Sequence, residues 1–316
     1  MYYIGVDLGG TNIATAVIDE SFKIIGKASV PTNAPRPVDE IAKDIAKSVE
    51  LAVENAGVSI EEINSVGIGS PGAVNAQDGI IEFSGNLDFE NAPLVEFVEK
   101  YTGKKTFIEN DANAAAYGEL VAGAGRGAKD FVAITLGTGV GGGVIIDGKI
   151  FSGWNSFGAE LGHINMIPNG EYCTCGRYGC WEAYASATAL IRQTKKAMEN
   201  DKSSKMWEIA GSLDNVNGKT AFDGMRAGDK TATDVVNQYI EYVACGIVDV
   251  INIFQPEFVC IGGGISKEGE NLRKPIEDYA NEFRFGKKAK KKTQIKMAEL
   301  GNDAGIIGAA FLGLNK

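Results

Sequence analysis

The sequence predicts an α/β protein built from two related halves. Two segments, 2–19 and 131–148, share one form: an apolar run, a glycine turn and a second apolar run. A third glycine-rich run, 259–266, predicts a strand, a turn and a helix. Amphipathic patterns between these runs predict helices, and strands that alternate with helices indicate an α/β architecture. The repeated form indicates a duplication.

Apolar periodicity predicts where the helices lie. The predicted segments are 38–56, 112–122, 183–200, 233–253 and 304–314. The last of them follows Asn302-Asp303, which predicts an N-cap at Asp303.

Length and charge limit the class of protein. The chain has 316 residues, slightly more than two domains of about 150 residues each. It carries 31 basic and 41 acidic side chains, a net charge of -10, which disfavours nucleic acid or an anionic membrane as a partner of the whole surface. The lysine-rich run 286–292 is expected to be a solvated face. No run reaches the roughly 18 uncharged apolar residues of a spanning helix, so we expect a cytoplasmic protein.

One histidine and three nearby cysteines predict a metal site: His163, Cys173, Cys175 and Cys180. One imidazole and three thiolates form a closed tetrahedral zinc set, with no position left for water or substrate. Glycines at 170, 176 and 179 favour a ligand knuckle, because glycine adopts positive φ angles at low cost. The alternatives are three buried thiols with an unrelated imidazole, or a disulfide. We therefore expect a structural Zn²⁺.

The two glycine turns, 9–12 and 137–139, are candidate phosphate sites. Clustered backbone N–H groups form an anion-binding nest, and the hydroxyl of a threonine in each turn adds a donor. An ordinary tight hairpin is the alternative for either turn alone. The third run, 262–264, could approach an adenosine, or could serve only close packing of a helix on a sheet.

Two other nucleotide-binding motifs are matched only in form. Gly137 to Gly142 satisfies the dinucleotide pattern G-x-G-x-x-G, but the glycines run into an apolar strand and an Asp147-Gly148 turn instead of a helix. Gly218-Lys219-Thr220 resembles the end of a P-loop, but Leu213 stands where that motif needs its first glycine. We expect neither motif to act as such.

Three carboxylates are candidates for chemistry. Asp111 ends an apolar strand at the start of a predicted helix, where it could be a general base or simply an N-cap. Glu160 and Glu182 flank the predicted metal site, which would hold them in one place. Ordinary surface positions are the alternative for either glutamate.

Taken together, these motifs resemble the ROK family of sugar kinases, within the actin-like, hexokinase-like ATPase superfamily, and most closely its bacterial glucokinases. The matching segments follow the family order over nearly the whole chain: 7–12, 109–113, 136–143, 160–163, 173–182 and 261–264.

The resemblance implies a two-lobed fold of duplicated ribonuclease-H-like domains. We expect a small α/β domain from 1–118 plus the C-terminal helix 303–316, and a large one from 119–302 with the zinc knuckle at 163–180. Proteins that look like this are commonly homodimers or homotetramers.

The resemblance further implies ATP-dependent phosphorylation of the 6-hydroxyl of a hexose, with glucose expected and with Mg²⁺ and Zn²⁺ as metals. Asp111 matches the catalytic base. The positions on the sugar side are Gly72, Asn86, Asn110, Asp111, Glu160, His163 and Glu182, with His163 also a zinc ligand. The positions on the nucleotide side are Asp7, Gly9, Gly10, Thr11, Asn12, Gly137, Thr138, Gly139, Gly262, Gly263 and Gly264.

Other members of the family keep several functions open. Kinases for N-acetylglucosamine, N-acetylmannosamine, fructose and allose share nearly all these motifs. The family also contains non-catalytic sugar-sensing repressors with an N-terminal helix-turn-helix. Here the first strand begins at Tyr2, which leaves no room for that element, so we expect an enzyme without a nucleic-acid partner.

Overall fold

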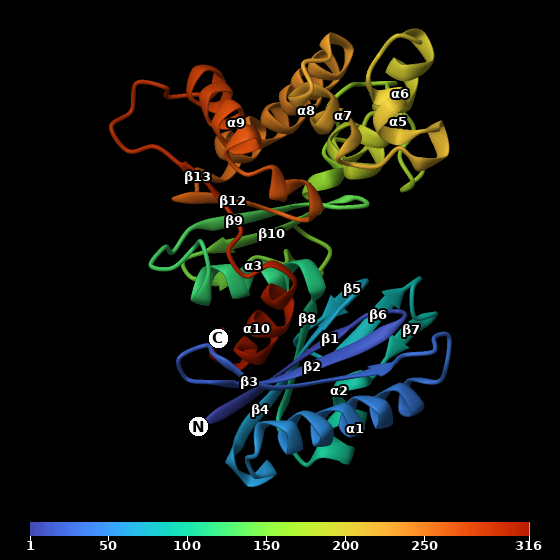
Figure 1. Ribbon diagram of the computed structural model, residues 1–316. Helices are drawn as coiled ribbons and strands as arrows, with labels where there is room; N and C mark the ends of the chain where they lie inside the picture. Colours follow the sequence, from blue (N-terminus) through green and yellow to red (C-terminus); the bar gives the residue numbers. More distant parts are fainter. Residues whose placement is uncertain (316) are drawn as a thin grey trace. The chain divides into compact units, whose positions relative to one another are not determined.

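The computed structural model describes residues 1–315 and has a mixed α/β architecture (Figure 1). Its first sheet has the strand order β3-β2-β1-β4-β8. The strands are β1 (Tyr2–Leu8), β2 (Asn12–Asp19), β3 (Ile24–Pro31), β4 (Ile63–Ser70) and β8 (Thr106–Asn110). β1, β2 and β3 pair antiparallel, whereas β4 and β8 extend the sheet in parallel from β1.

A second sheet repeats this order as β11-β10-β9-β12-β13. The strands are β9 (Phe131–Leu136), β10 (Val140–Ile146), β11 (Lys149–Ile150), β12 (Phe258–Gly262) and β13 (Gln294–Met297). In both sheets a meander of three successive strands is followed by two strands from later in the chain. The repeated order confirms the two related halves that the sequence predicts, and the turn at 147–148 joins β10 to β11 as a hairpin.

A small antiparallel sheet lies between β4 and β8 in the sequence. It consists of β5 (Ala73–Asn75), β6 (Ile80–Ser84) and β7 (Phe89–Ala92).

Helices cover both faces of the first sheet because side chains alternate along each strand. Ile4 and Val6 of β1 belong to one apolar cluster with Ile41 and Ile45 of α1 (Val38–Ala56). Between them, Gly5 faces α10 (Ala304–Ala310), where an added Cβ would lie 1.8 Å from a backbone oxygen of that helix. The remaining helices of this part are α2 (Leu94–Thr102) and α3 (Asp111–Ala122).

The helices that accompany the second sheet come from residues 182–283. They are α4 (Glu182–Ala185), α5 (Ala187–Asn200), α6 (Met206–Ala210), α7 (Thr220–Arg226), α8 (Lys230–Phe254) and α9 (Glu270–Phe283). Short 3₁₀ turns include η2 (Leu161–His163) and η4 (Gly264–Glu268). β12, η4 and α9 confirm the predicted strand, turn and helix around the third glycine run. No helix within residues 1–315 is long and apolar enough to cross a membrane.

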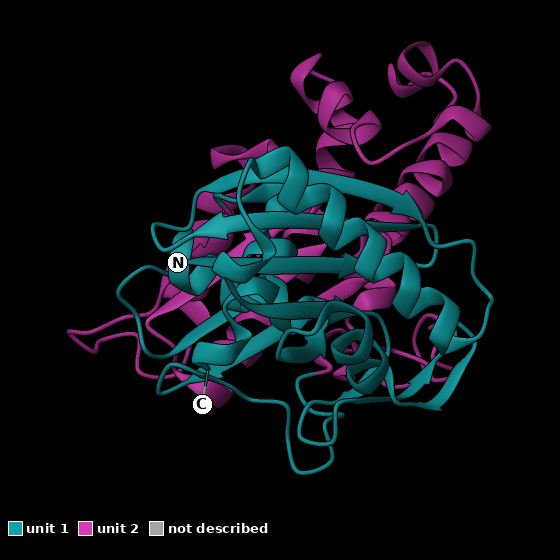
Figure 2. Cartoon of the chain, turned by 90° about the horizontal axis from the view of Figure 1, so that it is seen from below, with its two compact units in different colours: residues 1–133, 143–159, 299–316 teal, residues 134–142, 160–298 magenta. Residues whose placement is uncertain are grey.

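The chain divides into two compact units (Figure 2). Unit 1 comprises 1–133, 143–159 and 299–316, and unit 2 comprises 134–142 and 160–298. The domain limits predicted from the sequence, 1–118 with 303–316 and 119–302, stay a prediction.

The structure differs from the local helix predictions at three points. The predicted helix 183–200 is two helices, because Ser186 is extended at ψ 162° and its hydroxyl caps α5 by accepting the N–H of Ala189. Asp303 stands at the N-cap position of α10, as predicted, but its side chain makes no cap hydrogen bond and accepts the ammonium of Lys27 at 2.6 Å instead. That helix ends at Ala310, and a 3₁₀ turn (Leu312–Leu314) follows it.

Candidate active site

Unit 1 brings its polar site residues to the carboxyl ends of three parallel strands. Asp7 of β1 lies opposite Gly69 of β4, and Gly69 lies opposite Glu109 of β8. In open parallel sheets this edge is where ligands bind. Asp111 follows at once as the first residue of α3.

Asp111 is not needed to cap its helix. The side chain of Asn110 accepts the N–H groups of Ala112 at 2.9 Å and Asn113 at 3.3 Å, so Asn110 is the N-cap. Asp111 Oδ1 also accepts the N–H of Ala112, at 2.8 Å. Helix capping alone therefore does not explain an aspartate at position 111.

The two aspartates of unit 1 have raised pKa values. Loss of hydration raises the pKa of Asp111, although part of the side chain stays exposed, and hydrogen bonds from the adjacent backbone only offset this. Burial raises the pKa of Asp7 as well, and the negative charge of Asp111 raises it further. Two neighbouring carboxylates of this kind suit a divalent cation, which would relieve their repulsion.

Glu109 supports this turn from the interior. Its carboxylate is 6% exposed and accepts the backbone N–H of Asn110 at 2.9 Å and the side-chain amide of Asn113 at 3.1 Å. Burial raises its pKa. Glu109 and Asn113 therefore account for the surplus of polar groups that the sequence shows around Asp111.

The first glycine turn joins β1 to β2. The N–H of Gly9 donates to the carbonyl of Asn12 at 2.9 Å, which closes the turn. Thr32, which is fully buried after β3, donates its hydroxyl to Gly9 O at 2.6 Å and its N–H to Thr11 O at 2.8 Å. Thr32 thus holds this turn, and no local pattern marks it, because it follows another strand about twenty residues further along the chain.

Sugar-side residues predicted in unit 1 lie beside these groups. The side-chain amide of Asn110 donates to Gly72 O at 3.1 Å. Gly10 packs against Asn86, since a Cβ on Gly10 would lie 3.1 Å from Asn86 O. Unit 1 therefore links Gly72 with Asn110 and Asn86 with the first glycine turn.

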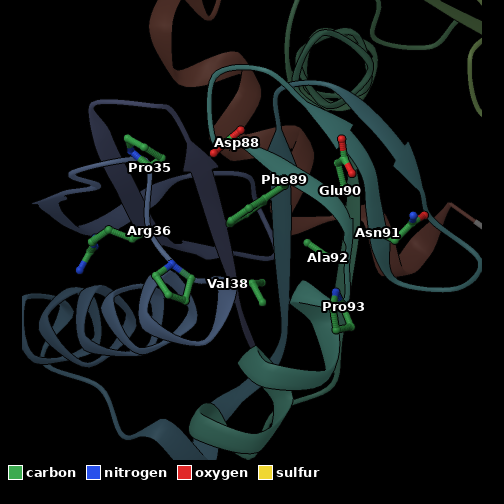
Figure 3. A pocket seen from close by; sticks show the side chains of 10 residues that line it. Pro35, Arg36, Val38, Asp88, Phe89, Glu90, Asn91, Ala92 and Pro93 are labelled. Carbon is green, nitrogen blue, oxygen red and sulfur yellow. The ribbon is translucent and has the colours of Figure 1, made fainter.

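A separate cavity of about 500 Å³ in unit 1 is lined by 35–38 and 88–93 (Figure 3). Phe89 lies between Val38 of one segment and Glu90 of the other in this view. None of the predicted sugar-side residues lines the cavity, so it is separate from the predicted sugar site.

The second glycine turn joins β9 to β10 and is held by the segment 182–188. Ala187 N–H donates to Gly137 O at 2.8 Å, and the Thr188 hydroxyl donates to Thr138 O at 2.8 Å. Glu182 accepts the N–H of Val140 at 3.0 Å. The carboxylate lies so close that a Cβ on Gly139 would be 2.2 Å from it.

The four predicted zinc ligands converge within unit 2. The possible ligand atoms of His163, Cys173, Cys175 and Cys180 all lie within 4.8 Å of one another. Cys175 and Cys180 have their sulfurs 3.6 Å apart, close to the roughly 3.8 Å that tetrahedral Zn–S bonds of about 2.3 Å require. The cluster fits a structural zinc site, and all five cysteines of the described chain are free thiols rather than disulfides.

The chemistry of the donors agrees with this site. His163 Nδ1 lies 3.6 Å from Cys173 Sγ, which leaves Nε2 for a ligand outside the cluster. Burial raises the pKa of Cys173 to about 12 and also raises that of Cys180, whereas the N–H of Arg177 lowers the pKa of Cys175. Zinc binding would displace these protons, so its affinity would rise with pH.

The third glycine run contacts the strand that leads into the second turn. Gly263 has φ 86°, and a Cβ there would lie 2.4 Å from Leu136 O. An added Cβ on Gly264 would meet nothing within 4 Å, so its backbone is open to a ligand.

Two sheets of one topology, each with a glycine turn between its first strands, define an α/β protein of the actin-like, hexokinase-like ATPase class. The chain belongs to the ROK family, whose model matches residues 3–316.

Three relatives illustrate the range of this similarity. The chain is 41% identical to a glucokinase of Thermotoga maritima, over 98% of this chain and 96% of that one. A solved ROK family glucokinase from Streptomyces griseus in complex with glucose and AMPPNP is 38% identical with a TM-score of 0.81, covering 99% of both chains. An N-acetylmannosamine kinase of Salmonella newport is 31% identical over 99% of this chain and 98% of that one.

Proposed function

We propose that this protein transfers the γ-phosphoryl group of ATP to the 6-hydroxyl of glucose. The observation that carries the proposal is the Asp111 carboxylate beside Asp7 at the carboxyl ends of the parallel strands, with the pKa of both groups raised. Relatives with about 40% identity over nearly the whole chain are glucokinases, and one was solved with glucose and an ATP analogue.

Asp111 is the general base in this proposal. Its ionised carboxylate accepts the proton of the 6-hydroxyl as the oxygen attacks the γ-phosphorus and the bond to ADP breaks. A raised pKa brings the base closer to the operating pH, which makes it a better proton acceptor. Asn110 leaves Asp111 free for this task because it provides the cap of α3.

The remaining residues bind and orient the nucleotide. Phosphoryl transfer has a loose transition state, so positioning and neutralisation of charge supply most of the catalysis. The amides of Gly10, Thr11 and Asn12, and those of Thr138 and Gly139, would bind phosphate oxygens. The N–H groups of Gly9 and Gly137 are used to close their turns, on the carbonyls of Asn12 at 2.9 Å and of Gly139 at 3.0 Å. Gly262, Gly263 and Gly264 would approach the adenosine. Asp7 would hold Mg²⁺, which neutralises charge on the phosphates when bound.

The proposed hexose contacts belong to both sequence halves. Gly72, Asn86 and Asn110 belong to unit 1, and Glu160, His163 and Glu182 belong to unit 2. His163 suits two tasks because Nδ1 faces Cys173, which leaves Nε2 for the sugar. Zn²⁺ supplies structure only, because the four protein ligands leave no open position.

A second candidate activity within this chemistry is the phosphorylation of an acetamido sugar. The similarity to an N-acetylmannosamine kinase favours it, at a lower identity than the glucokinases. Fructokinase activity and non-catalytic sugar sensing are more distant alternatives.

The test is ADP release by the purified protein with Mg-ATP and each of six sugars: glucose, N-acetylglucosamine, N-acetylmannosamine, mannose, fructose and allose. We expect kcat/KM for glucose to exceed the others by at least about tenfold, a difference of about 1.4 kcal/mol in transition-state binding. A lead by an acetamido sugar would move the substrate and keep the mechanism. Absence of turnover with every sugar would contradict the proposed activity.

We also propose that the protein acts in the cytoplasm as a homodimer or homotetramer, without nucleic-acid or membrane partners. A net charge of -10 supports the exclusion of polyanionic partners. The free thiols of the metal site support a reducing compartment.

A further inference from the structure

A cavity of about 470 Å³, called the β8 cavity below, lies within unit 1. β8 supplies 107–109 to its wall, the turn after β5 supplies 76–77, and Ile150, Leu312 and Asn315 complete it. A volume of this size suits a small organic molecule. None of the residues predicted to bind the sugar or the nucleotide lines the β8 cavity, so it is separate from both predicted sites.

The wall of the β8 cavity is largely apolar. Phe107, Ile150 and Leu312 line it. The side-chain amide of Asn315 is already used, because its Oδ1 accepts the N–H of Ile150 at 3.2 Å and its Nδ2 donates to the turn between β10 and β11 at 3.1 Å. Within the described chain, Glu109 is the only charged residue that lines the β8 cavity.

The carboxylate of Glu109 has one engaged and one free oxygen. Oε1 accepts the backbone N–H of Asn110 at 2.9 Å and the side-chain amide of Asn113 at 3.1 Å. Oε2 makes no hydrogen bond or ion pair with any residue from 1 to 315, although Glu109 is a buried residue. Burial of a charged oxygen without a partner costs free energy, which a donor from a ligand would offset.

The chemistry of this wall indicates an organic cation as the ligand. The carboxylate would repel an anion, and a metal ion would need several more oxygen ligands than one side chain supplies. A purely apolar ligand would leave Oε2 without a partner. A primary ammonium group on an apolar body fits, because its N–H groups donate to Oε2 while the body contacts Phe107, Ile150 and Leu312.

The same carboxylate connects the β8 cavity with the turn that carries the proposed base. Oε1 of Glu109 holds Asn110, which caps α3 and donates its side-chain amide to Gly72 O at 3.1 Å. Asp111 follows Asn110 directly. A cation that attracts the carboxylate toward the cavity would weaken the bond from Oε1 to Asn110 and so displace the base.

We propose that the β8 cavity is a second ligand site, which takes a small organic ammonium compound and through Glu109 lowers the turnover of the enzyme. Binding at this site is independent of the proposed kinase function, whereas the effect on turnover rests on it. Glu109 is a positioning residue, because it reaches Asp111 only through Asn110.

The test uses benzylammonium as the probe, titrated into the purified full chain by calorimetry. We expect a dissociation constant of about 1 mM, which is reasonable for so small a ligand. Benzyl alcohol has the same body without the charge and should bind at least about tenfold more weakly, because hydrogen bonds between charged groups are the stronger kind. At saturating benzylammonium, kcat with glucose should fall about fivefold, a usual coupling between two sites, and the KM for ATP should stay unchanged.

Two variants locate the probe. Glu109→Gln removes the charge and should raise the dissociation constant of benzylammonium about tenfold. Ala76→Trp places a large side chain at the wall of the β8 cavity from an exposed position and should also weaken binding about tenfold, even if Glu109→Gln fails to fold. Glu96→Gln is the matched control, since Glu96 is exposed on α2 and does not line the cavity, and it should bind the probe like the parent.

Calorimetry decides the site without reference to the kinase reaction. Absence of benzylammonium binding to the parent up to about 20 mM, or equal binding by the parent and Ala76→Trp, would overturn the site. Binding that leaves kcat unchanged would overturn the effect on turnover. If the parent phosphorylates none of the six sugars but binds benzylammonium as expected, the proposed function fails and the ligand site stands.

Discussion

The two glycine turns differ in what holds them, although their sheets share one strand order. Within unit 1, the turn at 9–12 is held by Thr32, at the end of the neighbouring strand of the same sheet. Within unit 2, the turn at 137–139 is held by 182–188, which directly follows the zinc ligand Cys180. Duplication therefore conserved the topology but not the support. The second turn is held by a segment that begins two residues after a predicted zinc ligand, whereas the first is held by a residue that follows a strand of its own sheet.

The largest expected difference between the two halves concerns the chemical step, because the proposed base lies in unit 1 alone. Asp111→Asn should lower kcat by about 10²-fold to 10⁴-fold, the usual contribution of a general base. Folding should remain intact, since Asn110 caps the helix. Turnover and circular dichroism check this, and turnover near that of the parent would contradict the role.

The raised pKa of Asp111 also predicts how the activity of the parent protein depends on pH. The pKa of Asp111 is raised in the folded protein, so the ionised form that acts as base is lost at a higher pH than for an ordinary aspartate near 3.9. kcat/KM of the parent should fall as pH drops through that raised pKa.

Asp111→Asn should be more stable than the parent at neutral pH, although it is less active. A raised pKa means that the folded state disfavours the charge, and this penalty is absent below about pH 3.9 and complete above the folded pKa. Asp111→Asn should therefore raise Tm at neutral pH, and the difference should vanish as pH falls below about 4. Equal Tm values at pH 7 would contradict the pKa shift.

Loss of zinc should affect the second turn and spare the first. Cys175→Ser removes one ligand, and loss of a structural metal belongs to the class of changes that cost about 4 kcal/mol or more. We expect less than one zinc per chain, a lower Tm and reduced turnover. Cys245→Ser is the matched control, because Cys245 lies on α8 outside the cluster. Full activity of Cys175→Ser would contradict the dependence on zinc.

A smaller loss of activity should follow from weakening one hydrogen bond that holds the second turn. Glu182→Gln keeps an acceptor for the N–H of Val140 but loses the charge, which costs about 1 kcal/mol, or about fivefold in kcat/KM for ATP. Glu199→Gln, on the exposed side of α5, should have no effect. Because Glu182 is also a proposed hexose contact, the KM for glucose should rise as well, and a rise confined to the KM for glucose would contradict its role on the turn.

The smallest expected effects come from removing the threonine hydroxyl that donates to each turn. Thr32→Val removes a buried hydrogen bond to Gly9 O and should lower the free energy of unfolding by about 1 kcal/mol. Thr188→Val removes the bond to Thr138 O from an exposed position, where water can replace it, so about 0.5 kcal/mol or less is expected. Urea denaturation measures both, and equal losses would contradict the difference in support.

Local patterns in the sequence determined the elements of this protein. The helix 38–56 agrees with α1 because apolar spacing and the terminal Gly57, at φ 67°, are properties of neighbouring residues. The glycine turns, their flanking strands and the zinc ligands were also predictable, since each motif lies within a short stretch of chain. The family motifs extended this to the fold and the candidate base.

Only the tertiary structure decided which groups hold or neutralise one another. Three contacts join residues far apart in the chain: Thr32 with Gly9, Lys27 with Asp303, and Glu182 with Val140. No local pattern marks such pairs, because hydrogen bonds and charges act through space and not along the sequence. For the same reason, the sequence could show that polar groups surround Asp111, but only the fold placed Glu109 at the wall of a cavity.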